Sequence, residues 1–215
     1  MFETLMSKTF VILSASLMIA YLGCLYAQSF FQKLIMTQQF DRIKRYNITA
    51  IIVNIIAFII LMFTSKIMPL NMLVMALFTL SSGFTLGLIT LAYQDTAQKA
   101  LGITALTTFL TGLIAMYSGL DFAWLGTFLF WGLIALIIVS IINLFMKIKG
   151  QKFIAGFGVL IFTGYLLFDF NNLAKLKQVA DANNWTTALD FAISIYLDII
   201  NLFLQLLQLL SSSNN

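Results

Sequence analysis

The sequence predicts an all-α polytopic membrane protein, with seven transmembrane helices and the last helix central in the bundle. Of the 215 residues, 61% are hydrophobic and 9% are charged, whereas a soluble domain has about 25% charged residues. The mean hydropathy is +0.99. A chain this apolar cannot bury its hydrophobic side chains inside a water-soluble globule of its size. We therefore expect residues 1–215 to form a single transmembrane domain.

Seven apolar stretches follow one another along the chain, each of about 20 residues, which matches a hydrocarbon core of roughly 30 Å. The first lacks a small-residue cleavage site, so we expect a retained helix and not a removed signal peptide. The spans are Thr9 to Phe31, Ile48 to Phe63, Leu70 to Tyr93, Ala100 to Tyr117, residues 122–145, Phe153 to Leu173 and Thr186 to Leu210.

The first three spans are separated by a polar segment, Gln32 to Asn47, and by a turn that contains the only proline, Pro69. We expect Pro69 in the first turn of the third helix, where a missing backbone N–H costs nothing. In the third span, Gly83 and Gly87 lie four residues apart and so share a helix face. Small residues at this spacing favour close helix packing, and we assign them no further role.

The middle spans carry polar residues with structural explanations. Residues Gln94 to Lys99 are expected to close the hairpin before the fourth span. Asp121 precedes the fifth span, where a carboxylate suits the start of a helix. The fourth span contains four threonines whose hydroxyls can bond to carbonyls of their own helix, namely Thr104, Thr107, Thr108 and Thr111.

The last span is long enough to cross a bilayer yet carries a stripe of polar residues. An α-helix turns about 100° per residue, which places these residues within about 80° of one another. A stripe of this kind cannot face lipid tails without severe cost, so we expect the other helices to surround this one. The stripe consists of Thr187, Asp190, Ser194, Asp198, Asn201, Gln205 and Gln208.

Two acids in successive spans are the candidate functional residues. Asp169 lies near the end of the sixth span and Asp198 within the seventh. Spans joined by a short loop run antiparallel, so these side chains can approach each other. Two carboxylates in a water-poor interior cannot both ionise cheaply and tend to share one proton. Loss of that proton would produce repulsion, or an oxygen-rich site for a hard cation such as calcium.

An alternative is that each acid is satisfied separately by a neighbour such as Tyr165. We favour a functional pair, because ionisable residues inside a membrane are functional by default, and because a chain without histidine needs carboxylates to respond to pH. The supporting polar residues are then Asn172, Asp190, Ser194, Asn201 and Lys66.

Several other classes of protein are not expected. With no histidine and Cys24 as the only cysteine, neither a zinc site of the usual kind nor an internal disulfide can be assembled. An intramembrane aspartyl protease also uses two aspartates in successive helices, but the second acid here follows IYL and lacks the GxG of those enzymes. A rhodopsin-like pigment needs a lysine in the last helix, and this span has none. We expect no enzymatic activity, no cofactor and no nucleic-acid partner.

Two segments carry a family resemblance: ISIYLDIINLFLQLL in the last span and GYLLFDFNNL at the end of the sixth. They resemble paired motifs of the Bax inhibitor family, also called the transmembrane Bax inhibitor motif family, in a bacterial-type member. The segments SGFTLG and GLDFAWLG resemble further landmarks of that family. Agreement in order and spacing covers residues 70–210.

The resemblance implies a last helix wrapped by six others and a pH-sensitive calcium leak controlled by Asp169 and Asp198. These two residues would sense protons, line the ion path and contact calcium. In some members a basic residue near the end of the second helix contacts the pair, and Lys66 is the nearest candidate here. The implied partners are the lipid bilayer, calcium ions and protons, and the implied location is the bacterial inner membrane. Some bacterial members resemble modulators of a membrane protease, which gives the alternative of a non-transporting regulator.

The orientation suggested by charge differs from the one the family implies. Of the 12 lysines and arginines, four lie on the face of the N-terminus, at positions 8, 66, 175 and 177, and the others lie on the opposite face. The positive-inside rule would then place the C-terminus in the cytoplasm. The family resemblance implies a cytoplasmic N-terminus instead.

Overall fold

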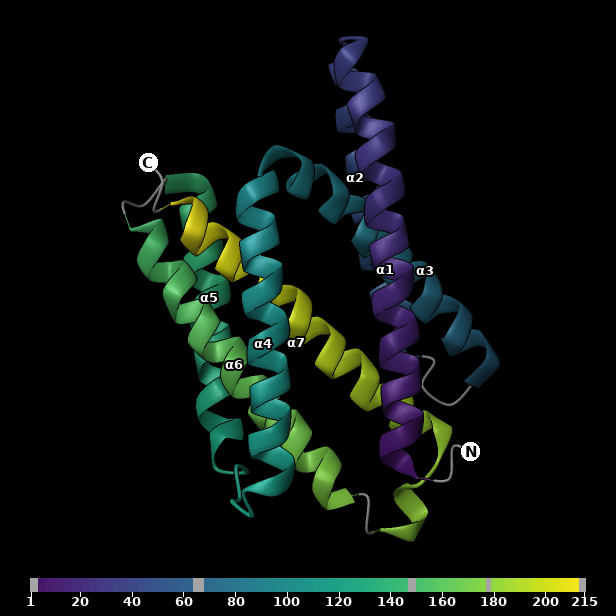
Figure 1. The fold of residues 1–215 in the computed structure, drawn as a ribbon, viewed down its shortest axis with the longest axis vertical. Helices are drawn as coiled ribbons and strands as arrows, with labels where there is room; N and C mark the ends of the chain where they lie inside the picture. The colour runs from purple at the N-terminus through teal and green to yellow at the C-terminus, as the bar shows by residue number, and fades with distance from the viewer. Residues whose placement is uncertain (1–3, 64–67, 147–149, 177–178, 213–215) are drawn as a thin grey trace. The chain divides into compact units, whose positions relative to one another are not determined.

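The computed structural model is helical over most of the residues that it describes (Figure 1). It describes residues 4–63, 68–146, 150–176 and 179–212, and no strand occurs among them. Seven helices in this described part are long and apolar enough to cross a membrane, which confirms the predicted fold class. They are α1 (Leu5–Met36), α2 (Phe40–Phe63), α3 (Met68–Ala92), α4 (Gln94–Tyr117), α5 (Leu125–Met146), α6 (Gln151–Leu176) and α7 (Trp185–Ser211), with a short 3-10 helix, η1 (Ala180–Ala182), before α7.

Several helices are longer than their apolar spans. The segment Gln32 to Asn47, expected to be a polar connection, is helical except at residues 37–39, where Gln38 adopts a left-handed φ of 55°. Residues Gln94 to Lys99 likewise begin α4 instead of closing a loop, and Tyr93 alone separates α3 from α4. Both expectations were wrong for one reason. Polar side chains at the membrane surface are solvated without breaking backbone hydrogen bonds, so a helix can continue beyond the hydrocarbon core.

The chain divides into two compact units, which are described separately. Unit 1 contains residues 1–94 and 184–193, and unit 2 contains residues 95–183 and 194–215. Helix α7 therefore contributes its first turns to unit 1 and the remainder to unit 2.

In unit 1, α3 packs against both α1 and α2. A Cβ atom on Gly83 would lie 2.0 Å from the carbonyl oxygen of Ala20, and one on Gly87 would lie 2.5 Å from the Cβ of Ala27. The two glycines thus let α3 touch α1, as predicted. Pro69 is the second residue of α3, which confirms its expected place in the first turn.

Side-chain amides also join the helices of unit 1. The amide of Asn54 on α2 donates to Oγ of Ser82 on α3, at 2.6 Å. The amide of Gln28 on α1 donates to Oγ1 of Thr90 on α3, at 2.9 Å, and Sγ of Cys24 lies 3.4 Å from the same hydroxyl. Polar contacts between helices keep these groups satisfied away from water.

In unit 2, α6 is the helix on which its neighbours pack. It contacts α5, and two of its aromatic rings lie over glycines. A Cβ atom on Gly112 of α4 would lie 3.5 Å from the ring of Phe170, and one on Gly126 of α5 would lie 3.0 Å from the ring of Phe168. Of the threonines on α4, Thr104 and Thr111 donate to carbonyls one turn earlier, as predicted.

Candidate functional site

The candidate site lies in unit 2, where α6 and α7 bring two acids together. Asp198 is only 7% exposed, and Asp169 is half-buried. Their carboxyl groups are close enough for a hydrogen bond between the side chains. Buried apolar residues of α7, among them Ile195 and Leu202, lie within one turn of Asp198. The apolar packing of α7 therefore holds one carboxyl group in a water-poor place beside the other.

One oxygen of this pair is unusual. Oδ2 of Asp198 is buried and has no hydrogen-bond partner within the part of the chain that the structure describes. Tyr165, one turn before Asp169 on α6, interacts electrostatically with both acids. A buried carboxylate oxygen without a donor is costly, so this oxygen is suited to hold a proton, a water molecule or a cation. The arrangement supports proton sharing and transient cation contact.

The pair is too small to bind calcium tightly on its own. Among the described residues, no three His, Cys, Asp or Glu side chains gather in one place. Calcium takes about six to eight oxygen ligands, and two carboxylates supply only part of that set. Asp169 and Asp198 alone therefore do not complete a calcium site.

The stripe on α7 is not buried along its whole length, contrary to expectation. Asp190 and Ser194 are exposed, whereas Asp198 is buried and Asn201 is half-buried. The first turns of α7 follow the last hydrophilic loop, where water can solvate polar groups without a partner helix. Only the deeper part of the stripe therefore needs protein around it.

Not all of the remaining predicted residues interact with the acid pair. The amide of Asn201 donates to the carbonyl oxygen of Leu197 on its own helix, at 2.8 Å. Asn172 is half-buried on α6, three residues after Asp169. Lys66 lies outside the described residues.

Asn171, which was not among the residues predicted from the sequence, holds the loop between α4 and α5 by side-chain hydrogen bonds. It is 4% exposed. Its Oδ1 accepts from the backbone N–H of Phe122 at 3.1 Å, and its Nδ2 donates to the carbonyl oxygens of Leu120 at 2.9 Å and Ala115 at 3.3 Å. One side chain, two residues from Asp169, thus satisfies two backbone groups of this connection and one in the last turn of α4.

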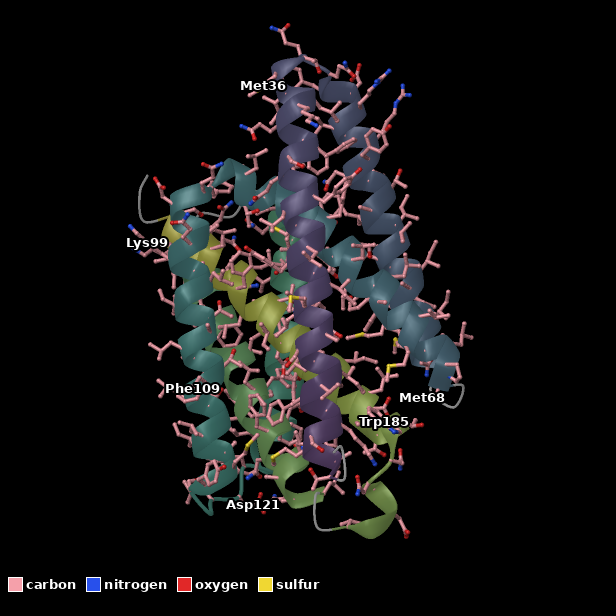
Figure 2. All side chains as sticks on the ribbon, turned by 45° about the vertical axis from the view of Figure 1, so that its right-hand side comes forward. Met36, Met68, Lys99, Phe109, Asp121 and Trp185 are labelled. Atoms are coloured by element: carbon pink, nitrogen blue, oxygen red, sulfur yellow. The ribbon has the colours of Figure 1, made fainter. Side chains whose placement is uncertain are left out.

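Asp121 lies in the same loop and not at the start of a helix, because α5 begins only at Leu125. Its Oδ1 accepts from the backbone N–H of Ala123 at 2.7 Å. The carboxylate of Asp121, which is labelled in Figure 2, forms an ion pair with Lys175 near the end of α6. The hydrogen bond from Lys175, followed by that from Ala123, lowers the pKa of Asp121. The prediction that Asp121 caps a helix is therefore wrong. Its carboxylate instead accepts a hydrogen bond within a turn and forms an exposed ion pair.

Comparison with known proteins gives a family match over nearly the whole chain. The model of the family described as Bax1-I, inhibitor of apoptosis-promoting Bax1, matches residues 3–215. An uncharacterized protein of Helicobacter pylori (strain J99) is 30% identical over 208 residues, which is 94% of this chain and 84% of that protein. A BI1-like protein of Arabidopsis thaliana is 34% identical over 156 residues, 68% of this chain and 57% of its own length. The Golgi anti-apoptotic protein of vaccinia virus (strain Lister) is 34% identical over 149 residues, 68% of this chain and 60% of its own length.

Proposed function

This chain belongs to the Bax inhibitor family of integral membrane proteins, and from that premise we propose that it is a pH-sensitive calcium leak channel controlled by Asp169 and Asp198. The observation that carries the proposal is the meeting of these two carboxyl groups at the α6–α7 contact, with Oδ2 of Asp198 buried and unpartnered. We place the protein in the bacterial inner membrane. The proposed function needs no cofactor and includes no catalytic step.

The proton is the controlling element in this mechanism. With one proton between the carboxyl groups, Asp169 and Asp198 share a hydrogen bond that ties α6 to α7. Without it, two negative charges lie together in a medium of low dielectric constant, and their repulsion is far stronger than in water. The helices must then separate or admit a cation. Calcium prefers hard oxygen ligands, so the same oxygens that share the proton would contact the passing ion.

The test is flux through the purified protein in liposomes loaded with a calcium indicator. Native protein is expected to give a flux that changes with pH, measured between about pH 5 and pH 8, because one proton enters or leaves the acid pair as a unit, and Asp198→Asn is expected to remove that dependence. Asp190→Asn is the matched control, because it makes the same change to an exposed acid on the same helix and should retain the native profile.

A flat trace from folded native protein would refute the leak. If the native protein gives no flux and instead copurifies with a membrane protease, the alternative of a non-transporting regulator is supported.

A further inference from the structure

A second polar group lies on the same side of α7 as Asp198. Gln205 follows Asp198 by seven residues, which is two helical turns, so the two side chains project from nearly the same face about 10 Å apart along the axis. Gln205 Oε1 is buried and has no hydrogen-bond partner among the described residues. Like Oδ2 of Asp198, it is an acceptor held away from water.

The structure makes specific room for this amide. Gly158 on α6 has no Cβ, and one built there would lie 2.5 Å from Cδ and 2.6 Å from Oε1 of Gln205. The amide therefore occupies a notch in α6 that exists only because residue 158 is glycine. Since α6 also carries Asp169, the acid pair and the Gly158–Gln205 contact lie on one interface between the same two helices.

The surroundings of Gln205 are apolar. Its α7 neighbours Leu202, Phe203, Leu206 and Leu207 are all buried. The nearest polar residue of the stripe toward Asp198 is Asn201, whose amide is already bonded to its own helix. Gln205 thus offers an unbonded amide oxygen among buried apolar residues of its own helix.

Amide oxygens are among the ligands that hard cations accept, and Oε1 of Gln205 has no donor among the described residues that a cation would have to displace. We propose that Gln205, seated against Gly158, is a second oxygen station for the permeating cation, beyond the acid pair on the way along α7. The inference rests on the proposed function, because it assumes that a cation passes Asp198. It assigns two separate tasks, in which the acid pair sets the pH response and Gln205 sets the ease of passage.

Two variants remove the station by different routes. Gln205→Leu replaces the amide by an apolar side chain of similar size. Gly158→Ala leaves the amide in the chain but places a methyl group in its notch. Gly156→Ala is the matched control on the same helix, because a Cβ there meets only Leu209, at 4.0 Å.

Calcium flux in indicator-loaded liposomes is the measurement, with folding checked by size-exclusion chromatography and thermal unfolding. Both variants are expected to lower the flux about tenfold, the effect of losing one good polar interaction. The pH at which flux is half-maximal should stay at the native value, because Asp169 and Asp198 are unchanged. If Gln205 serves only in packing, its variants would change thermal stability, but they would not lower the calcium flux while leaving the pH of half-maximal flux at the native value.

The outcomes distinguish this inference from the function on which it depends. No flux from native protein overturns the proposed function itself. If the pH dependence of the native flux is lost in Asp198→Asn, but the flux of Gln205→Leu stays within about twofold of native, the station alone is overturned. If Gly158→Ala fails to fold, Gln205→Leu decides, since it adds no bulk at the helix contact. Equal losses in Gly158→Ala and Gly156→Ala would also overturn the assignment, because only the former disturbs the amide.

Discussion

Replacing Asn171 by leucine should free the loop between α4 and α5 from the side-chain hydrogen bonds that hold it. The adjacent Asn172 provides a control. The asparagine and leucine side chains share the same branched arrangement of heavy atoms, so the main change is the loss of hydrogen bonds. Asn171→Leu leaves the N–H of Phe122 and the carbonyl oxygens of Leu120 and Ala115 without their side-chain partner. Ala115 belongs to the last turn of α4, where carbonyls lack a partner in the helix itself.

The size of the effect follows from these three bonds. A neutral hydrogen bond contributes about 0.5–1.5 kcal/mol net, and an unsatisfied buried group costs about 1–3 kcal/mol. The bond to Ala115 is long, at 3.3 Å, and the loop is open enough for water to replace part of the loss. We therefore expect a decrease of roughly 2–4 kcal/mol in the free energy of unfolding. In a chain of this length that corresponds to a drop in Tm of roughly 5–10 °C.

Thermal unfolding in detergent, followed by far-UV circular dichroism, measures the Tm of Asn171→Leu and of Asn172→Leu side by side. Limited chymotrypsin digestion reports the loop directly, because Leu120 and Trp124 are already exposed and cleavage there should quicken when the loop is released. Asn172 is half-buried on the same helix end, so Asn172→Leu should change neither quantity much. If the two variants behave alike in both assays, the three hydrogen bonds of Asn171 do not hold the loop.

Two further predictions concern a close helix contact and an exposed ion pair. Gly83→Ala should lower stability by at least about 2 kcal/mol in a detergent thermal shift, because its methyl group would meet the backbone of α1; Gly102→Ala has open space around it and should be neutral or stabilising by up to about 1 kcal/mol. Equal effects would contradict the contact. Asp121 has a lowered pKa, so its ion pair is lost only as pH falls below the ordinary value of 3.8. Calcium flux measured between about pH 5 and pH 8 should therefore keep its native pH midpoint in Asp121→Asn. A shifted midpoint would show that the loop between α4 and α5 takes part in pH sensing.

The number of helices was predictable because the hydrocarbon core sets a minimum length and the sequence alternates long apolar runs with polar breaks. Their ends were less predictable. The polar residues from Gln32 onward look like a connection, yet α1 continues to Met36 and α2 begins at Phe40. A helix forms its own backbone hydrogen bonds, so it need not end where the hydrocarbon core ends. The central position of the last helix in the bundle stays a prediction.

The two acids could be brought together from the sequence by one argument, namely that neighbouring spans run antiparallel. The residues around them could not. Whether Asn171 or Asn172 faces the loop depends on the rotation of α6 about its axis, and a pair of adjacent asparagines gives no information about that rotation. Gly158 likewise reads as an ordinary small residue, because its partner Gln205 is 47 positions away in the sequence and only the packing of α6 on α7 reveals the match.

The tight turn between α1 and α2 has a consequence for the lipid that surrounds the protein. Because only residues 37–39 interrupt the helices, the exposed side chains of Lys33, Arg42, Lys44 and Arg45 lie on helical turns close to the chain reversal. Each basic group near a membrane surface contributes about 1 kcal/mol of attraction to anionic phospholipid. These four basic side chains should attract acidic headgroups to one end of the α1–α2 hairpin. The lipid next to them is therefore expected to differ in composition from the bulk bilayer.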